Sequence, residues 1–233
     1  MNILIVVTSA ASLAPAHPTG LWLEEFAIPY TALAEVGIVP TVASPKGGAA
    51  PIDPKTAPDE AAKLQWRAAL EALSATIPLA EVSAADFDAL YIPGGHGPMV
   101  DLAKDSVLTS LIEAFDRAGK PIAALCHGPA ALVAARAADG RPLLAGRKAT
   151  GFTNGEETAA GLAAVVPFLL ETRMREAGAL FEHALIPGAG HVVADGALLT
   201  GQNPASSTAM ARALAETLAA RQRAALAAAD TAT

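Results

Sequence analysis

Four short apolar segments of strand length constrain the fold more than any other feature of this sequence. They occupy residues 3–7, 37–43, 89–92 and 121–125, and amphipathic helical stretches lie between several of them. The clearest helix is predicted over residues 105–118, with Asp105 at its N-cap and Gly119 just past its end. Strands that alternate with helices predict an α/β fold, in which a mostly parallel sheet carries helices on both faces.

Further elements follow from local signals in the sequence. A first helix is expected over residues 20–36, where Pro29 should kink or interrupt it. A proline-rich loop over residues 46–58 leads into a helix predicted over residues 59–73. Turn residues at 200–204 precede a long alanine-rich helix that reaches toward Ala228. All of these elements fit one domain over residues 1–233.

Composition and charge exclude several classes of partner. Hydrophobic residues make up 52% of the 233 residues, which is ample for a core, and the net charge of −7 comes without a basic cluster. Nucleic acid and anionic membranes are therefore not expected as partners. The apolar N-terminal run is too short to span a bilayer and lacks signal-peptide features, so a cytoplasmic location is expected. The single cysteine excludes an intrachain disulfide and a cysteine-based metal cluster.

That cysteine, Cys126, directly follows the predicted strand at 121–125 and precedes Gly128 and Pro129, which open a predicted helix. This strand–nucleophile–helix turn is analogous to the nucleophile elbow of serine hydrolases. A side chain at such a turn projects from the carboxyl edge of the sheet, where α/β folds bind ligands. The amides at the helix N-terminus should favour a thiolate over a thiol. A small buried cysteine is the ordinary alternative, but this context favours a nucleophile.

A glycine-rich turn, Gly94 to Pro98, ends the strand predicted at 89–92 and should lie at the same sheet edge. The backbone amides of Gly95 and His127 could then form an oxyanion hole beside Cys126. His96 could line the same pocket or could face solvent as a turn residue. Since no histidine pair has ligand spacing on one helix, no metal is predicted.

Four strings in chain order, YIPGGHGPMVDL, ALCHGPAAL, ATGFTNGEE and LLTGQNPASS, resemble the PfpI-type branch of the class I glutamine amidotransferase-like superfamily. Within that branch they are most similar to the glyoxalase III and heat-shock-chaperone-like members. The resemblance covers nearly the whole chain. It implies a flavodoxin-like sandwich with a small cap, and a homodimer.

The resemblance also implies the site residues, which in this group are a cysteine, a histidine, an acid and a further glutamate from the first helix. The cysteine and histidine correspond to Cys126 and His127. The spacing from the first-helix glycine points to Glu25, with Glu24 as a possible second contact in the substrate pocket. The third acid is Glu157 rather than Glu156. Many relatives have a histidine before the first-helix proline, where this chain has Ile28.

Physical chemistry is consistent with these roles. A glutamate buried beside a thiolate is kept protonated by desolvation and by the like charge, so Glu25 could shuttle a proton. Glu157 could orient His127, as the third member of a triad does. The alternative for Glu24 and Glu25 is a solvated helix face, and only the resemblance favours a role for Glu25.

The resemblance implies a glutathione-independent glyoxalase III, a lyase of the D-lactate dehydratase type. It would convert methylglyoxal to lactate, or glyoxal to glycolate, through a cysteine hemithioacetal and without a cofactor. The alternatives are a stress-response holdase chaperone with a redox-sensing cysteine, a PfpI-type peptidase, or a deglycase. Glutaminase activity is not expected, because the C-terminal His-x-Glu pair of amidotransferases is absent from the sequence.

Overall fold

The computed structural model describes residues 1–230, in which a seven-stranded sheet has the strand order β10-β11-β7-β6-β1-β4-β5. All neighbours in this sheet are parallel except β10 and β11. The sheet strands are β1 (Ile3–Val6), β4 (Thr41–Ser44), β5 (Ile77–Pro78), β6 (Ala89–Ile92), β7 (Ile122–Leu125), β10 (Val192–Asp195) and β11 (Leu198–Gly201). Two small two-stranded sheets pair β2 (Ser12–Ala14) with β3 (His17–Pro18) and β8 (Lys148–Ala149) with β9 (Leu180–Phe181).

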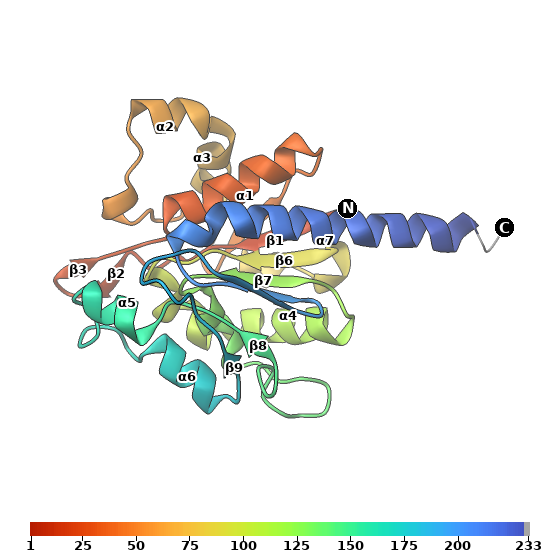
Figure 1. The fold of residues 1–233 in the computed structure, drawn as a ribbon. Helices are drawn as coiled ribbons and strands as arrows, with labels where there is room; N and C mark the ends of the chain where they lie inside the picture. Colours follow the sequence, from red (N-terminus) through yellow and green to blue (C-terminus); the bar gives the residue numbers. More distant parts are fainter. Residues whose placement is uncertain (231–233) are drawn as a thin grey trace.

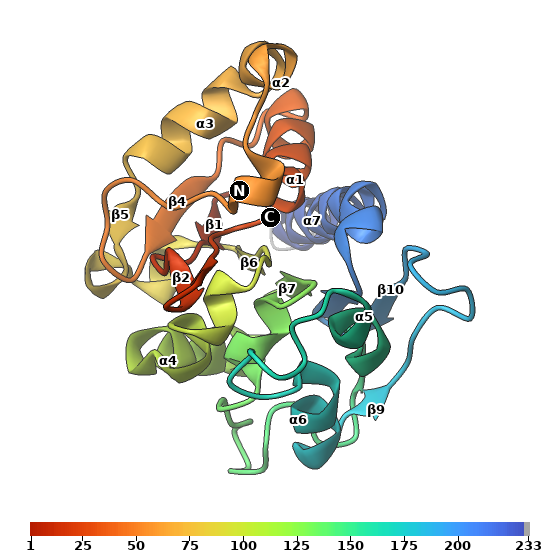
Figure 2. The ribbon, with the colours of Figure 1, turned by 90° about the vertical axis from the view of Figure 1, so that its left-hand side faces the viewer.

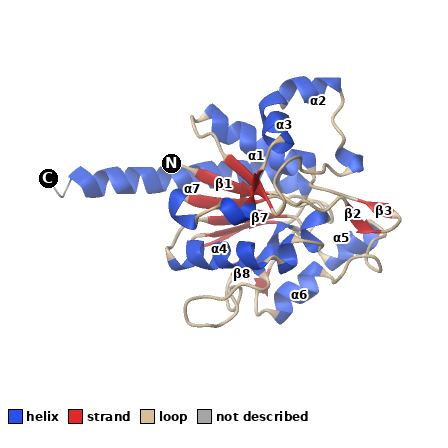
Figure 3. Cartoon of the chain, turned by 180° about the vertical axis from the view of Figure 1, so that it is seen from behind, coloured by secondary structure: helices blue, strands red, loops and turns tan. Residues whose placement is uncertain are grey.

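Helices cover both faces of the sheet, so the fold is the predicted three-layer α/β sandwich of flavodoxin type (Figure 1). The α-helices are α1 (Leu23–Glu35), α2 (Glu60–Gln65), α3 (Arg67–Ser74), α4 (Ser106–Arg117), α5 (Asn154–Ala159), α6 (Leu170–Glu176) and α7 (Ser207–Asp230). Helices α1 and α7 lie side by side on one face, and α4 lies on the other (Figure 3).

Alternation along the strands explains the two covered faces. In β1, Ile3 and Ile5 pack in the core beneath α1 and α7, whereas Leu4 and Val6 pack in the core beneath α4. Successive strand side chains point to opposite faces, so a strand that is apolar at every position must be covered twice. The continuous apolar run near the N-terminus is therefore a central strand, as predicted.

The order of the strands brings two loops of the sequence to one place. Strands β6 and β7 are parallel neighbours, with Ile92 opposite Ala124. The glycine-rich turn after β6 and the cysteine turn after β7 consequently leave the same edge of the sheet next to each other. Figure 2 views this end of the molecule, where α5 approaches from the other side.

Helix α4 is confirmed with small shifts at its ends, whereas the strand predicted over residues 37–43 is confirmed only in its last part. Helix α4 begins after Asp105, whose carboxylate accepts hydrogen bonds from the first-turn amides, as the N-cap prediction required. The strand predicted over residues 37–43 begins only at Thr41. The amides of Gly37, at a φ of +81°, and Ile38 donate to carbonyls in the last turn of α1 and so end that helix. Pro40 has no amide hydrogen and cannot donate a hydrogen bond to a neighbouring strand.

The first helix begins at Leu23, not at residue 20, and continues through Pro29. Proline lacks an amide hydrogen, so the carbonyl of Glu25, four residues earlier, has no intrahelical donor. The hydroxyl of Tyr91 on β6 donates to that carbonyl at 2.5 Å. A strand side chain thus supplies the bond that Pro29 removes, and the same bond ties the Glu25 backbone to the sheet.

Two other helix predictions need correction. The helix predicted over residues 59–73 is two helices, α2 and α3, separated at Trp66, whose backbone leaves the helical region. The helix predicted after Cys126 is a single 3₁₀ turn, Gly128–Leu132. Gly128 packs so closely on β6 that a Cβ there would lie 2.2 Å from the carbonyl oxygen of Ile92. A 3₁₀ turn this short carries only a small dipole toward the cysteine.

In the part of the chain that the structure describes, no helix combines the length and the apolar character that crossing a bilayer requires. The alanine-rich helix α7 is present as predicted, and Figure 1 shows its C-terminal half extending beyond the sheet.

Candidate active site

Cys126 sits at the sharp turn that the sequence predicts after β7. Among residues 1–230 it is the one non-glycine residue with a positive φ, 58°, a conformation that costs roughly 1–3 kcal/mol and that surrounding contacts must enforce. Its amide donates to the carbonyl of Gly201 at 2.9 Å, and its carbonyl accepts from the amide of Phe152 at 2.9 Å. The residue is only 3% exposed. Strand β11 and the segment before α5 therefore hold the turn from two sides.

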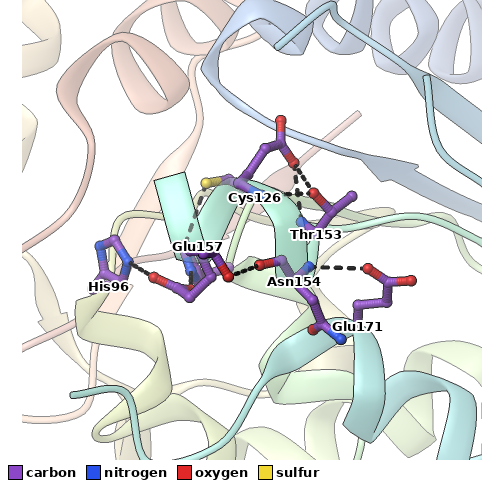
Figure 4. Close-up of polar contacts among 9 residues, drawn as sticks. His96, Cys126, Thr153, Asn154, Glu157 and Glu171 are labelled. Atoms are coloured by element: carbon purple, nitrogen blue, oxygen red, sulfur yellow. Dashed lines mark hydrogen bonds and ion pairs between the residues drawn. The ribbon is translucent and has the colours of Figure 1, made fainter. Parts of the chain in front are cut away.

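His127 and Glu157 extend from the sulfur in one hydrogen-bonded line. The Cys126 Sγ lies 3.3 Å from His127 Nδ1, and His127 Nε2 lies 2.7 Å from Glu157 Oε2. Glu157 is buried on α5, and Figure 4 shows it between His96 and the cysteine turn. These three side chains, from two distant parts of the sequence, meet in the order of a nucleophile, base and orienting acid.

Local structure explains why Glu157 rather than Glu156 faces the histidine. The Glu156 carboxylate accepts the amide of Thr153 at 3.0 Å in a capping box at the start of α5. Its other oxygen accepts from Asn203 Nδ2 at 2.6 Å. Glu156 is therefore engaged at the helix start, and Glu157, one position on, turns toward His127. Asn203 belongs to the string LLTGQNPASS, but its part in holding this helix is visible only in three dimensions.

Glu25, in the first turn of α1, lies fully buried beside the sulfur. Its Oε2 accepts the amide of Gly94 at 2.8 Å, whereas its Oε1 has no hydrogen-bond partner. Burial raises the pKa of Glu25 to about 8, although contacts with Cys126 and the Gly94 amide lower it. Glu25 is thus a neutral carboxylic acid at pH 7, which is the form that can donate a proton.

The structure does not support the predicted resting thiolate. Burial, and then the carboxyl of Glu25, raise the pKa of the Cys126 thiol well above its ordinary value, and the Gly95 and His127 amides only partly offset this. The prediction relied on a helix N-terminus that is a short 3₁₀ turn, and it ignored the burial of the sulfur. Burial raises the pKa of both groups, and the carboxyl of Glu25 raises that of the thiol further, so Cys126 and Glu25 form a coupled pair that retains its protons near neutrality.

The backbone amides of Gly95 and His127 both donate toward the cysteine sulfur, the arrangement predicted for an oxyanion hole. Gly95 has a φ of +86°, and Gly94 beside it has no room for a side chain. A Cβ on Gly94 would lie 2.7 Å from the Cys126 Cβ, from Glu25 Oε2 and from the His127 amide nitrogen. The glycines of this turn therefore let its backbone approach Cys126 closely.

The protonation of His127 and Glu157 follows from their surroundings. Burial, and then the neighbouring His96, lower the pKa of His127 to about 4. Burial alone would raise the pKa of Glu157, but the hydrogen bonds from His127 and His96 outweigh it and bring it to about 2. At neutral pH Glu157 is ionised and accepts only, so His127 carries its proton on Nε2 and presents the lone pair of Nδ1 to the thiol.

The two residues predicted for the substrate pocket differ. His96 lines a cavity of about 160 Å³, together with residues of β3 and of the segment 53–55. Its Nε2 lies 2.8 Å from Glu157 Oε1, so it also belongs to the polar network. Glu24 is half-buried, and none of its described contacts reaches Cys126 or His127. Its charge contributes to the raised pKa of Glu25.

One group of side chains has donor atoms placed for a metal ion. His96, His127 and Glu157 each offer one donor, and these atoms lie within 4.8 Å of one another. Two imidazoles and a carboxylate suit zinc. Both imidazole Nε2 atoms, however, already contact the Glu157 carboxylate. A metal ion would have to replace these contacts, including the one that joins His127 to Glu157.

Two aromatic residues near the site were not singled out from the sequence. Phe152 stacks on His127 with ring centroids 4.5 Å apart. Tyr91 lies beneath Glu25 and donates to its carbonyl. Both occur in the strings that carry the family resemblance, but the contact of each ring with a site residue depends on which distant segments pack together, and that is not visible in the sequence.

Comparisons with known proteins show which proteins this chain is similar to. Glutathione-independent glyoxalase HSP31 of Saccharomyces cerevisiae is 33% identical over 132 residues, covering 54% of this chain and 56% of that protein. Glutathione-independent glyoxalase hsp3101 of Schizosaccharomyces pombe is 27% identical over 228 residues, covering 90% and 93%. In the alignments with the first curated relatives, the chain spans only 56–62% of the relative's own length.

Solved structures are similar over nearly the whole chain. The X-ray structure of Francisella tularensis Rapid Encystment Protein 24 KDa is 33% identical with a TM-score of 0.87, covering 93% of this chain and 98% of that one. The sequence profile of the DJ-1/PfpI family matches residues 19–217, which include all the site residues described above. This chain is a member of the DJ-1/PfpI family.

Proposed function

We propose that this protein is a glutathione-independent glyoxalase III that converts methylglyoxal to lactate. The observation that carries the proposal is the buried carboxylic acid of Glu25 beside Cys126, itself linked to a neutral His127. A thiol, a base for its proton and a separate acid are the groups that an aldehyde addition followed by an internal proton transfer requires. The closed site, with Cys126 only 3% exposed, favours a small substrate.

In the first step, Cys126 Sγ adds to the aldehyde carbon and the thiol proton moves to Nδ1 of His127. The developing oxyanion is stabilised by the Gly95 and His127 amides and receives the proton of Glu25, giving a neutral hemithioacetal. Glu25 is left as a carboxylate and His127 as an imidazolium paired with Glu157. This protonation pattern explains why a carboxylic acid and a neutral imidazole are both needed at rest.

In the second step, the Glu25 carboxylate removes the proton from the hemithioacetal carbon, and His127 protonates the ketone oxygen to give an enediol. Glu25 then returns its proton to the neighbouring carbon while the other hydroxyl proton passes to His127, which leaves a thioester of lactate. Water hydrolyses the thioester, giving one proton to Glu25, and the sulfur recovers its proton from His127. The net reaction is methylglyoxal plus water to lactic acid, which ionises to lactate and a proton, and no redox cofactor is consumed.

The names of the relatives support this proposal. The yeast relatives HSP31 and hsp3101 are both glutathione-independent glyoxalases, and the second aligns with 90% of this chain. The test is turnover of methylglyoxal by the purified protein, with chiral analysis of the lactate formed. We expect one lactate enantiomer from the wild type and none above background from Cys126→Ala. Racemic product, or equal turnover by the two proteins, would contradict the proposal.

A second candidate function, a holdase chaperone, is favoured by a different part of the surface. A groove of about 640 Å³ runs between α5 and the segment 183–188, with a mostly apolar lining that includes Phe152 and Leu185. Leu185 is 96% exposed and its neighbour Ile186 is 72% exposed, a pattern typical of surfaces that bind apolar segments. If this function operates, Leu185→Ser should weaken suppression of aggregation of a client protein, whereas Cys126→Ala should not.

We also infer that residues 1–233 act as one domain and that the protein forms a homodimer, as the family resemblance implies. Light scattering coupled to size-exclusion chromatography tests the dimer, which should have twice the 23.5 kDa chain mass. A monomer mass at micromolar concentration would contradict this inference.

A further inference from the structure

Glu157 contacts two histidines, and the proposed reaction uses only one of them. We propose that His96 is a positioning residue for the site: it holds the outer oxygen of Glu157 and keeps His127 in its neutral, proton-accepting form. The expected kinetic effects of changing His96 rest on the proposed function, whereas the expected effect of His96 on the protonation of His127 does not.

The first observation is the geometry of the carboxylate. His96 Nε2 contacts Glu157 Oε1 at 2.8 Å, and His127 Nε2 contacts Oε2 at 2.7 Å. An ionised carboxylate only accepts, so both imidazoles carry a proton on Nε2. Figure 4 shows the contact of His96 with Glu157. With each oxygen bound by a different ring, the carboxylate is held against rotation, and Oε2 stays directed at His127.

The second observation is that burial increases from His96 through Glu157 to His127. The side chain of His96 is 10% exposed, that of Glu157 is 3% exposed and that of His127 is 1% exposed. His96 alone of the three lines the cavity beside β3. His96 is therefore the side chain of the three that borders this cavity, and His127 lies deeper.

The third observation is the distance between the two rings, whose centroids lie 4.0 Å apart. One carboxylate can compensate one imidazolium, and a second positive charge at this distance would be unpaired and buried. A proton on His96 therefore opposes a proton on His127. The lowered pKa of His127, for which burial is the largest cause and His96 the next, agrees with this reasoning.

Other charged groups around the pair do not account for the effect. Near His127 these are Glu156, Cys126 and Glu25, and along the cavity beside His96 they are His17, Asp53 and Lys55. Asp53 is occupied by the Thr19 hydroxyl and the Lys55 amide. All of these groups remain when His96 alone is replaced, so a change in His127 titration can be assigned to His96.

The experiment compares His96→Gln, His96→Leu and the control His183→Gln, an exposed histidine whose one polar contact among the described residues is with the carbonyl of Ala184. The amide nitrogen of glutamine can still donate to Glu157 but cannot become charged, whereas leucine removes both properties. The titration of His127 is followed by NMR of the imidazole in the absence of substrate. We expect its midpoint to rise by about one pH unit or more in both His96 variants, and to stay unchanged in the control.

The kinetic comparison separates positioning from charge. At pH 8, His96→Gln should keep kcat within a few-fold of wild type, while His96→Leu should lose more, though less than the roughly 100- to 10,000-fold expected for loss of the base itself. The acid limb of kcat/KM should move to higher pH in both variants. An unchanged His127 midpoint in a folded His96→Gln protein would overturn the inference. If the wild-type protein does not turn over methylglyoxal, the proposed function is contradicted. The role of His96 is then decided by the NMR titration of His127 alone.

Discussion

Cys126 and Glu25 form a buried pair in which the ionisation of either group opposes the ionisation of the other. Glu25 is fully buried with one oxygen unpartnered, and its pKa is raised to about 8 mainly by desolvation. The same burial raises the pKa of the Cys126 thiol. Both groups of the pair therefore keep their protons at rest, and Cys126 differs from the exposed, low-pKa thiols typical of redox sensors.

Alkylation of Cys126 by iodoacetamide should follow a pKa higher than that of a free thiol, about 8.5. The reason is that burial and Glu25 both disfavour the thiolate. In Glu25→Gln the like charge is removed, so the midpoint of the rate against pH should move down. A wild-type midpoint at or below that of a free thiol would contradict this account.

Glu25→Gln should lower methylglyoxal turnover by roughly 100- to 10,000-fold, the range for loss of a general acid–base. Glu24→Gln is the matched control, because the next residue on the helix points about 100° away and has no described contact with Cys126. Steady-state kinetics on both variants decide the matter, and comparable losses in the two would show that the role of Glu25 has been misassigned.

His127 and Glu157 should behave as a unit, since residues that act together give non-additive losses. His127→Ala removes the base, whereas Glu157→Gln removes only the acceptor that orients it. Glu157→Gln should therefore cost less, and its effect should nearly vanish when His127 is already alanine. A double-mutant cycle on turnover measures this coupling, with melting curves to verify folding, and additive losses would remove Glu157 from the site.

At the scale of elements, the site depends on two turns that leave neighbouring strands. Strand β7 ends in the strained turn at Cys126, and β6 ends in the glycine turn whose amides approach the sulfur. Helix α1 adds Glu25 through the contact with Gly94, and α5 adds Glu157. Each element supplies one group, so small shifts between elements should affect activity more than stability.

Gly94→Ala tests the packing of the two turns. The new Cβ would meet the Cys126 Cβ, Glu25 Oε2 and the His127 amide at 2.7 Å, so the turns must separate. We expect loss of most turnover and a destabilisation of about 1–3 kcal/mol, which is typical of overpacking. Gly155→Ala on α5 is the control, since its nearest contact is Thr153 Oγ1 at 3.8 Å, and it should be neutral or slightly stabilising. Wild-type turnover in Gly94→Ala would refute the close packing.

At the scale of the whole molecule, the buried acid links the stability of the fold to pH. The folded pKa of Glu25, about 8, lies above its ordinary value of 4.5. Between these values the folded protein holds a proton that the unfolded chain has released, so stability falls as pH rises. The lowered pKa values of Glu157 and His127 act in the opposite sense, because in their range the unfolded chain holds a proton that the folded protein has released. Stability is lost as the pH falls from 4.5 to about 2 for Glu157 and from 6.5 to about 4 for His127.

Glu25→Gln should therefore gain stability relative to wild type as the pH rises from 5 to 8. Glutamine never ionises, so the variant lacks the cost of keeping the carboxyl protonated, which is at most on the order of 4 kcal/mol over this range. Calorimetric melting curves at several pH values measure the difference. A gap between the two proteins that stays constant with pH would show that Glu25 is not a buried neutral acid.

The sequence by itself determined the fold class, the central strands and the position of the turn at Cys126. Each depends on local patterning: apolar runs such as residues 3–6 must be covered on both faces, and Cys126 directly follows such a run. Helix α4 was predicted correctly because Asp105 signals its start locally. The choice of Glu25 and Glu157 came from the family resemblance, and no periodicity in the chain distinguishes them from their neighbours.

Only the tertiary structure decided how these groups behave. The ionisation of Cys126 depends on its burial and on Glu25, which is 101 residues away in the chain, and neither is visible in the local sequence that predicted a thiolate. The contact of His96 with Glu157 is likewise one between the turn after β6 and α5, which tertiary packing creates. Local patterns specify elements because they act through neighbouring residues, whereas pKa values and hydrogen-bond partners depend on which distant side chains displace water from the site.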